Sequence, residues 1–483
     1  FFNGTSVFLL PDGRDERECL VEIVRPDGDA YKRWKVATAM DEARGHGGAA
    51  RRHGFGLYRA ANYDELIDHP VEMGEFTLAT FEAGGIPHEI VLTGRHDCDV
   101  ERLCADLSRV CQWQIDLFGA PPPMRRYLFL TMVVGNGYGG LEHRASTALL
   151  TSRDDLPYRD MEGSSDGYRQ FLGLCSHEYF HSWNVKRIKP AAFVPYDLSC
   201  ENHTRLLWAF EGITSYYDDL ALVRSGVISA DEYLAQLGKT ISNVLRGSGR
   251  FRQSVAESSF DAWTKYYRQD ENAPNAIVSY YTKGALIALC LDLQLRIASA
   301  GCQSLDDLMR ALWARHGETG LGVPEDGVFE LVAELAGTKL ASWLRRAVNA
   351  TGELPLARFL KSVAVTLEVT PAGALGRLGV KLASGEEVKL ANVHDGGAAQ
   401  QAGLSAGDVI IAMDGLRVSS SSIEARLLRM VPGETVRVHA FRRDELMEFD
   451  LMPAEAPATE ARLALSTRAG RDASRLRKAW LGI

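Results

Sequence analysis

The pattern His177-Glu178-x-x-His181 is the feature that most constrains this chain. Residues four apart in a helix lie on one face, so His177 and His181 can reach the same ion. Glu178 lies close enough to polarise a bound water without being a ligand itself. Apolar side chains flank the pattern and predict a largely buried helix: Phe171, Leu172, Leu174, Phe180 and Trp183. Because buried histidines need partners, the pattern predicts a metal site rather than a helix face with two solvated histidines.

Glu211 is the best candidate for a third ligand, since a catalytic zinc ion takes three protein ligands and keeps one position open. It follows the apolar run 206–210, and a carboxylate in an apolar helix is costly unless it is paired or bound to metal. Gly212, directly after it, allows close approach of another helix. Asp218 and Asp219 follow on the same helix. Each could hydrogen-bond a ligating histidine or lie on a solvated face.

Composition and charge narrow the function classes. The 483 residues predict about three domains, and the formal charge of -9 with a pI near 5.8 argues against a nucleic-acid partner. No apolar run approaches the roughly 18 residues that a membrane span needs. No pair of cysteines has the spacing of a zinc knuckle, so a Cys-based metal site is not expected. Several cysteines, such as Cys290, lie among apolar neighbours like small buried hydrophobic residues, which favours a reduced, cytoplasmic compartment. The chain opens on Phe1, so we expect a processed or truncated start, with the periplasm as the alternative if a signal is missing.

The pattern of elements predicts an α+β multidomain protein. Residues 1–95 alternate short strands with turns and predict a β-rich N-terminal domain, with truncation at its start left open. Residues 96–365 are mainly helical, and residues 366–456 return to short strands with Gly-rich turns. Residues 457–483 are rich in arginine and predict a tail that is either solvated or docked as a helix.

Two segments resemble the gluzincin aminopeptidases, and most closely the glycyl aminopeptidase family. They are residues 177–187, His-Glu-Tyr-Phe-His-Ser-Trp-Asn-Val-Lys-Arg, and residues 211–217, Glu-Gly-Ile-Thr-Ser-Tyr-Tyr. The resemblance implies a thermolysin-like catalytic domain, here the helical region, joined to a PDZ domain. The segment between His181 and Glu211 is longer than in the aminopeptidase N pattern. The assignment of Glu211 therefore rests on its Glu-Gly-x-Thr context.

The same resemblance implies roles for two further segments. Gly139-Gly140-Leu141-Glu142-His143 is similar to a loop in which glutamate binds the free α-ammonium of the substrate. Glu142 is thereby implied to bind substrate, together with Gly139 and Gly140. Tyr281-Thr282-Lys283-Gly284 is similar to a segment whose tyrosine donates to the tetrahedral oxyanion. Tyr281 is the favoured tyrosine, and its neighbour Tyr280 remains an alternative.

The C-terminal region resembles a PDZ domain. The segment Arg377-Leu378-Gly379-Val380 is similar to a carboxylate-binding loop, and residues 396–410 are similar to a segment common in PDZ domains of bacterial proteases. Such a domain binds an extended C-terminus as an added strand, with the loop amides of Leu378, Gly379 and Val380 holding its carboxylate. The occupant could be a protein substrate, a partner's tail or this chain's own terminus. A purely structural PDZ domain is the alternative.

Together these features predict a zinc-dependent aminopeptidase. His177, His181 and Glu211 would hold zinc, Glu178 would activate the attacking water, and Tyr281 would support the oxyanion. The substrate would be a peptide with a free N-terminus, and the resemblance implies small terminal residues such as glycine or alanine. Two alternatives are a zinc endopeptidase and a PDZ-based peptide-binding protein with a vestigial metal site.

Overall fold

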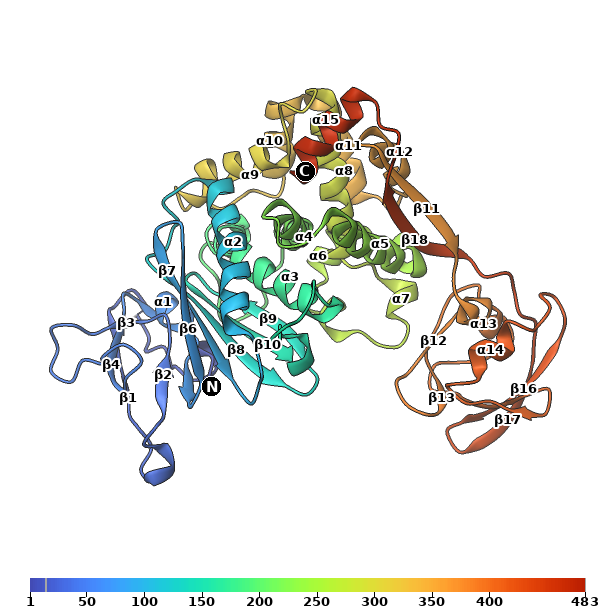
Figure 1. The fold of residues 1–483 in the computed structure, drawn as a ribbon, viewed down its shortest axis with the longest axis horizontal. Helices are drawn as coiled ribbons and strands as arrows, with labels where there is room; N and C mark the ends of the chain where they lie inside the picture. Colours follow the sequence, from blue (N-terminus) through green and yellow to red (C-terminus); the bar gives the residue numbers. More distant parts are fainter. Residues whose placement is uncertain (14, 483) are drawn as a thin grey trace.

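The computed structural model describes residues 1–13 and 15–482 as a small β-rich region, a large central body and a C-terminal β-domain (Figure 1). The first region contains β1 (Cys19–Ile23), β2 (Lys35–Ala37), β3 (Asp41–Glu42), β4 (Gly56–Ala60), α1 (Tyr63–Ile67) and β5 (Glu72–Gly74). β1, β4 and β3 form one sheet, and β2 pairs with β5. Buried side chains including Met40, Tyr58 and Val71 give this region its own core.

The central body is built on a five-stranded sheet in the order β6-β7-β8-β10-β9. Its strands are β6 (Thr77–Ala83), β7 (Ile86–Thr93), β8 (Tyr127–Val134), β9 (Tyr138–Glu142) and β10 (Ser146–Ser152). Helix α2 (Val100–Phe118) connects the parallel neighbours β7 and β8. β9 is antiparallel to β10 and lies at the edge of the sheet. Among the described strands, β9 pairs only with β10, so its outer edge is free to pair with a further chain.

The predicted boundary at residue 95 falls inside this body and is not a domain boundary in the structure. β6 and β7 precede it, yet β7 pairs in parallel with β8, from His88 opposite Tyr127 to Thr93 opposite Met132. The local pattern identifies both segments as strands, but the choice of partner strand depends on contacts between residues far apart in the sequence. The N-terminal β-region therefore ends before β6.

Further helices complete the central body and enclose the main core. They are α3 (Asp166–Phe180), α4 (Ile213–Arg224), α5 (Ala230–Arg246), α6 (Val255–Phe260), α7 (Ala273–Ala276), α8 (Thr282–Ala298), α9 (Leu305–Leu312), α10 (Gly327–Ala336), α11 (Thr338–Asn349) and α12 (Leu356–Ser362). α3 contacts β9 and β10 on one side and α4 on the other. Among the helices of the described residues, none combines the length and apolar character needed to cross a membrane.

The C-terminal domain has a separate core and is connected to the body by a two-stranded ribbon (Figure 1). The ribbon pairs β11 (Val365–Pro371) with β18 (Ala458–Leu465). The domain contains β12 (Val380–Leu382), β13 (Val388–Val393), α13 (Ala398–Gln401), β14 (Val409–Met413), β15 (Leu416–Arg417), α14 (Ile423–Leu427), β16 (Val436–Arg442) and β17 (Glu445–Leu451). Asn275 of the body fixes it, donating to the Val393 carbonyl (2.8 Å) and accepting from the Asp395 N–H (2.9 Å).

The predicted tail is part of the body. Its first half is β18, and its second half is α15 (Arg471–Leu481), which packs against α4 and α8. Trp480 is fully buried, donates to the Tyr216 hydroxyl (2.9 Å) and accepts from Arg224 Nε at its carbonyl (2.7 Å). The segment is therefore a docked helix and not a solvated tail. Burial of the Trp480 indole stabilises the docked helix, and the arginines around it stay exposed to solvent.

Candidate metal centre

Helix α3 carries both histidines at its C-terminal end. Ser165 begins the helix by accepting from the Tyr168 N–H, and the helix ends at Phe180, directly before His181. The rings of His177 and His181 lie 4.7 Å apart and nearly perpendicular to each other. His181 is buried and His177 is partly buried. One helix face therefore presents two imidazole nitrogens to the interior, as the spacing predicts.

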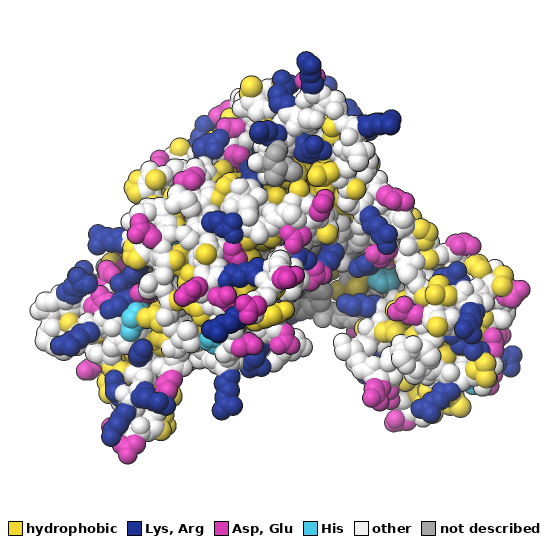
Figure 2. Space-filling model, viewed as in Figure 1, with side chains coloured by type: hydrophobic (Ala, Val, Ile, Leu, Met, Phe, Trp, Pro, Cys, Tyr) yellow, Lys and Arg dark blue, Asp and Glu magenta, His cyan; other side chains and the backbone are white. Residues whose placement is uncertain are grey.

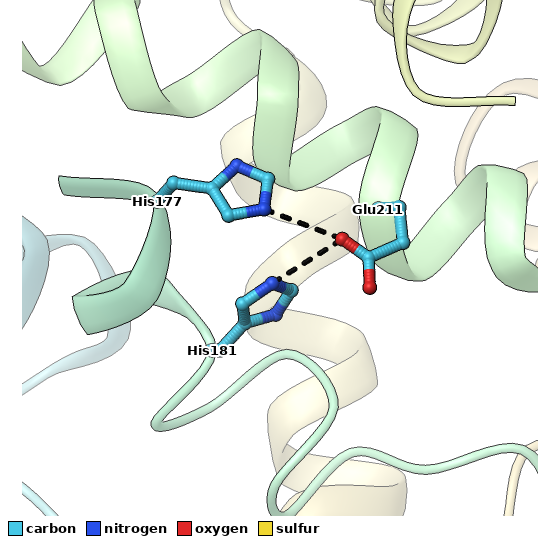
Figure 3. Close-up of side chains that lie close together, drawn as sticks. All are labelled: His177, His181 and Glu211. Carbon is cyan, nitrogen blue, oxygen red and sulfur yellow. Dashed lines mark hydrogen bonds and ion pairs between the residues drawn. The ribbon is translucent and has the colours of Figure 1, made fainter. Parts of the chain in front are cut away.

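Glu211 reaches the same point from a second helical segment. It lies in a π-helical turn, Trp208–Gly212, that continues into α4, and such turns occur frequently at functional sites. Its Oε2 atom is 3.3 Å from Nε2 of His177 and 3.3 Å from Nε2 of His181 (Figure 3). The candidate ligand atoms of all three residues lie within 4.8 Å of one another. The three residues could therefore hold one ion.

The second nitrogen of each imidazole has its own acceptor. Nδ1 of His177 lies 3.1 Å from Asp218 Oδ2, and Nδ1 of His181 lies 2.7 Å from the carbonyl oxygen of Asn184. A proton on each Nδ1 donates to these acceptors and leaves both Nε2 lone pairs directed at Glu211. Two neutral imidazoles and one carboxylate that converge on a point suit a zinc ion with an open position.

Charge in the cluster also favours a cation. Burial alone would raise the pKa of Glu211, but the charge of His181 and hydrogen bonds from both histidines lower it to about 2. Burial disfavours the charged form of His177, yet hydrogen bonds and charges from Asp218 and Glu211 raise its pKa well above the usual range. Asp218 and Glu211 thus stabilise positive charge between them. Protons on the imidazoles can carry that charge, and a bound metal ion would replace them and leave the imidazoles neutral.

Glu178 packs against strand β9. Its Oε2 atom is buried and has no hydrogen-bond partner among the described residues. Burial raises its pKa to about 7, with the charges of His177 and His181 acting in the opposite direction. Candidate ligand atoms of Glu142, Glu178 and His181 lie within 4.8 Å of one another. Two carboxylates are therefore close together beside the point shared by the histidines.

Glycines allow the close approaches that build the site. A Cβ at Gly140 would overlap the Glu178 carboxylate, so β9 lies directly against this side chain. A Cβ at Gly212 would come within 2.6 Å of the Cα of Gly284 in α8, which is the close approach that the sequence predicted after Glu211. A Cβ at Gly139, which points to the opposite face of β9, would meet open space. The missing side chain at Gly140 thus allows β9 to lie against Glu178.

The two candidate tyrosines occupy different places. The Tyr281 ring stacks on His177 with 6.2 Å between centroids. Tyr280 is fully buried behind it, with its ring 4.7 Å from that of Tyr281. Of the two, Tyr281 is therefore the tyrosine beside a candidate ligand.

Three polar residues around the ligands have different partners. Asp218 is hydrogen-bonded to His177, whereas Asp219 accepts from Gln236 Nε2 (2.8 Å) and has no hydrogen bond to a histidine among the described residues.

Asn184 was assigned no role from the sequence, although it lies in the family-like run after His181. Its amide donates to the backbone oxygens of Ala209 and Phe210 and to Thr214 Oγ1 at 3.1–3.2 Å. Asn184 therefore ties the histidine helix to the turn that carries Glu211.

The predicted carboxylate-binding loop of the C-terminal domain forms hydrogen bonds within itself. The N–H groups of Leu378 and Gly379 donate to the Leu375 carbonyl, 3.1 Å in both cases. Val380 begins β12, an edge strand of its sheet. Two of the three predicted amides thus have acceptors within the loop.

A cavity of about 950 Å³ lies between the C-terminal domain and the body. Figure 2 shows the hollow between these two parts. Val380 and Lys381 of β12 line it on one side, and Tyr266 and Ser279 line it on the other. The edge strand that would receive a peptide therefore faces the body.

Three family descriptions match consecutive parts of the chain: the Peptidase M61 N-terminal domain at residues 1–75, M61 glycyl aminopeptidase at 170–287 and the PDZ domain at 376–452. The solved structure of an aminopeptidase N family protein from Idiomarina loihiensis is similar, with 44% identity, a TM-score of 0.93, and coverage of 99% of this chain and 82% of that chain. An M1 zinc metallopeptidase from Deinococcus radiodurans has 14% identity and a TM-score of 0.45, over 70% of this chain and 64% of that chain. No curated protein matches.

These matches confirm the predicted fold class, with a β-rich N-terminal region, a helical catalytic region and a C-terminal PDZ domain. The N-terminal match ends at residue 75, directly before β6. The chain belongs to the M61 glycyl aminopeptidase family, a family of metallopeptidases.

Proposed function

We propose that this enzyme is an aminopeptidase that removes small N-terminal residues from peptides. One observation supports this most strongly: Glu142 and Glu178 lie together beside the point on which His177, His181 and Glu211 converge. In an α-amino acid the ammonium group and the carbonyl carbon are two bonds apart. An anchor for the amine must therefore lie next to the group that activates water, as these two carboxylates do.

His177, His181 and Glu211 would hold the zinc ion. When bound, zinc would act as a Lewis acid that polarises the scissile carbonyl and lowers the pKa of the water bound to it. Asp218 and the Asn184 carbonyl would keep the two imidazoles in the tautomer that ligation requires.

The remaining roles belong to residues of this chain. Glu142 would bind the substrate ammonium and so fix which peptide bond is cleaved. Glu178 would accept a proton from the attacking water and return it to the leaving nitrogen. The pKa of about 7, raised by burial, suits a group that must both accept and release a proton near neutral pH. Tyr281 would donate to the oxygen that becomes negative in the transition state.

The substrate class follows from the family and from β9. The family's name is glycyl aminopeptidase, which supports a small terminal residue. The free edge of β9, with Gly139 and Gly140, would pair with an extended peptide backbone. The C-terminal domain would hold a further segment of peptide. The eight cysteines are all free, which supports a reducing compartment such as the cytoplasm.

A direct test compares a peptide with its N-acetylated form on the zinc-loaded enzyme. The free peptide should be hydrolysed and the acetylated one should not, because acetylation removes the charge that Glu142 would bind. Chelation should abolish activity and added zinc should restore it. Equal hydrolysis of both peptides would instead establish the endopeptidase alternative, which the open edge of β9 would also permit.

A further inference from the structure

Tyr267 is a surface residue whose hydroxyl bonds to that of Tyr281, the tyrosine that stacks on His177. It lies in the short turn Tyr266–Arg268, and its side chain is 59% exposed. Its hydroxyl oxygen is 3.0 Å from that of Tyr281 and 3.3 Å from that of Tyr280. Three phenol groups therefore form one chain of hydrogen bonds that ends at the residue beside His177.

Packing leaves Tyr281 little freedom except rotation of its hydroxyl. Its ring stacks on His177 at 6.2 Å, on Tyr266 at 5.6 Å and on Tyr280 at 4.7 Å between centroids. Rings held in this way have a fixed plane, whereas a phenolic proton turns to suit its neighbours. What remains to be fixed is the direction in which the Tyr281 proton points.

That direction depends on which hydroxyl donates in each bond of the chain. Tyr280 donates to Tyr267. An oxygen that accepts a hydrogen bond becomes a better donor, because bonds in a chain polarise one another. In the bond between Tyr267 and Tyr281 either oxygen can be the donor. When Tyr267 uses its single proton in this bond, Tyr281 accepts it, and the Tyr281 proton is free to point away from Tyr267.

We infer that Tyr267 is a positioning residue for Tyr281, holding the Tyr281 hydroxyl in the orientation that donates to the transition-state oxyanion. This inference rests on the oxyanion role proposed for Tyr281. It differs from a structural role because an exposed side chain contributes little to folding, while loss of its hydroxyl changes a bond made only in the transition state.

The test uses the zinc-loaded full chain with an unblocked peptide substrate. Y281F should lower kcat about 10²–10³-fold, the usual cost of losing an oxyanion donor. Y267F should lower kcat about tenfold, equivalent to one neutral hydrogen bond, with KM and zinc content unchanged. The double variant Y267F/Y281F should be no slower than Y281F, since Tyr267 acts only through Tyr281.

Y266F is the matched control, because the Tyr266 hydroxyl bonds to Ser279 Oγ (3.0 Å) and not to Tyr281. It should keep the kcat of the parent enzyme. Two results would overturn the role of Tyr267 while leaving the oxyanion role of Tyr281 intact. One is a parental kcat for Y267F alongside an impaired Y281F, and the other is a double variant about tenfold slower than Y281F. A parental kcat for Y281F would remove the oxyanion role itself, and the role of Tyr267 with it.

Discussion

The metal centre and the PDZ loop are both candidate binding sites, but they use their polar groups differently. At the metal centre, Nδ1 of each histidine has an acceptor, and both Nε2 atoms converge on Glu211. In the PDZ loop, the amides of Leu378 and Gly379 already donate to the Leu375 carbonyl. The histidine helix is prepared for a ligand, whereas two of the three loop amides already donate within the loop.

This difference shows how to weigh two equally recognisable motifs. A motif identifies which groups are present, but binding energy depends on whether those groups are free when the ligand arrives. At the metal centre, Glu178 has a buried oxygen without a partner among the described residues. A carboxylate entering the PDZ loop must first displace internal hydrogen bonds. Substitutions at the metal centre should therefore have large effects and changes at the loop small ones.

The largest effect should come from Glu178→Gln. Loss of the general base should lower kcat about 10²–10⁴-fold, while the zinc content of the purified protein stays the same because Glu178 is not a ligand. Peptide hydrolysis and metal analysis on one preparation measure both. A variant that loses zinc would place Glu178 among the ligands and change the account of this site.

Glu142→Gln should lower kcat/KM for unblocked peptides about 100-fold, because a charge-assisted hydrogen bond to the ammonium is lost. The amide keeps the shape of the side chain, so thermal unfolding should not change. Steady-state kinetics with free and N-acetylated peptides check the result. If the ratio between the two peptides stays at the parental value, amine recognition lies elsewhere.

Asp218→Asn should weaken zinc binding about 10–100-fold by removing the acceptor that orients His177. Competition with a chelator measures the affinity. Asp219→Asn is the matched control, since Asp219 bonds to Gln236 rather than to a histidine. Equal weakening in both variants would mean that total negative charge, and not orientation of one imidazole, determines zinc affinity.

The smallest effect is expected at the PDZ loop. For a peptide that binds the Glu178→Gln enzyme, amidation of the peptide's C-terminus should weaken binding by less than about tenfold, because displacing internal bonds offsets the gain from the carboxylate. Calorimetry with matched acid and amide peptides gives the ratio. A ratio of about 100-fold would show that the loop opens, and the contrast with the metal centre would then disappear.

Much of the metal centre could be predicted because its chemistry is local. The spacing of His177 and His181 places both on one helix face whatever surrounds it. Glu211 stood out because a carboxylate in an apolar run needs a partner, and Gly212 signalled a close helix contact. The PDZ domain likewise followed from small motifs in register. In each case the residues that carry the signal are neighbours in sequence.

Tertiary structure decided the matters that depend on direction and on distant pairing. Asp218 and Asp219 are successive residues of α4, so they point about 100° apart, and only packing against α3 made Asp218 the partner of His177. Packing also decided that Tyr281, and not Tyr280, stacks on His177. It likewise decided that the Asn184 amide donates to Ala209 and Phe210, which are remote from it in the sequence.

The sequence by itself determined the fold class, the PDZ domain and which residues are candidates for the metal ligands and the catalytic glutamate, because helical periodicity and the cost of buried charge act within a few residues. Only the fold decided that β6 and β7 join the catalytic sheet, that α15 docks against α4 and α8, and which acceptor each imidazole meets. Those outcomes depend on contacts between distant segments, which no local pattern of residues records.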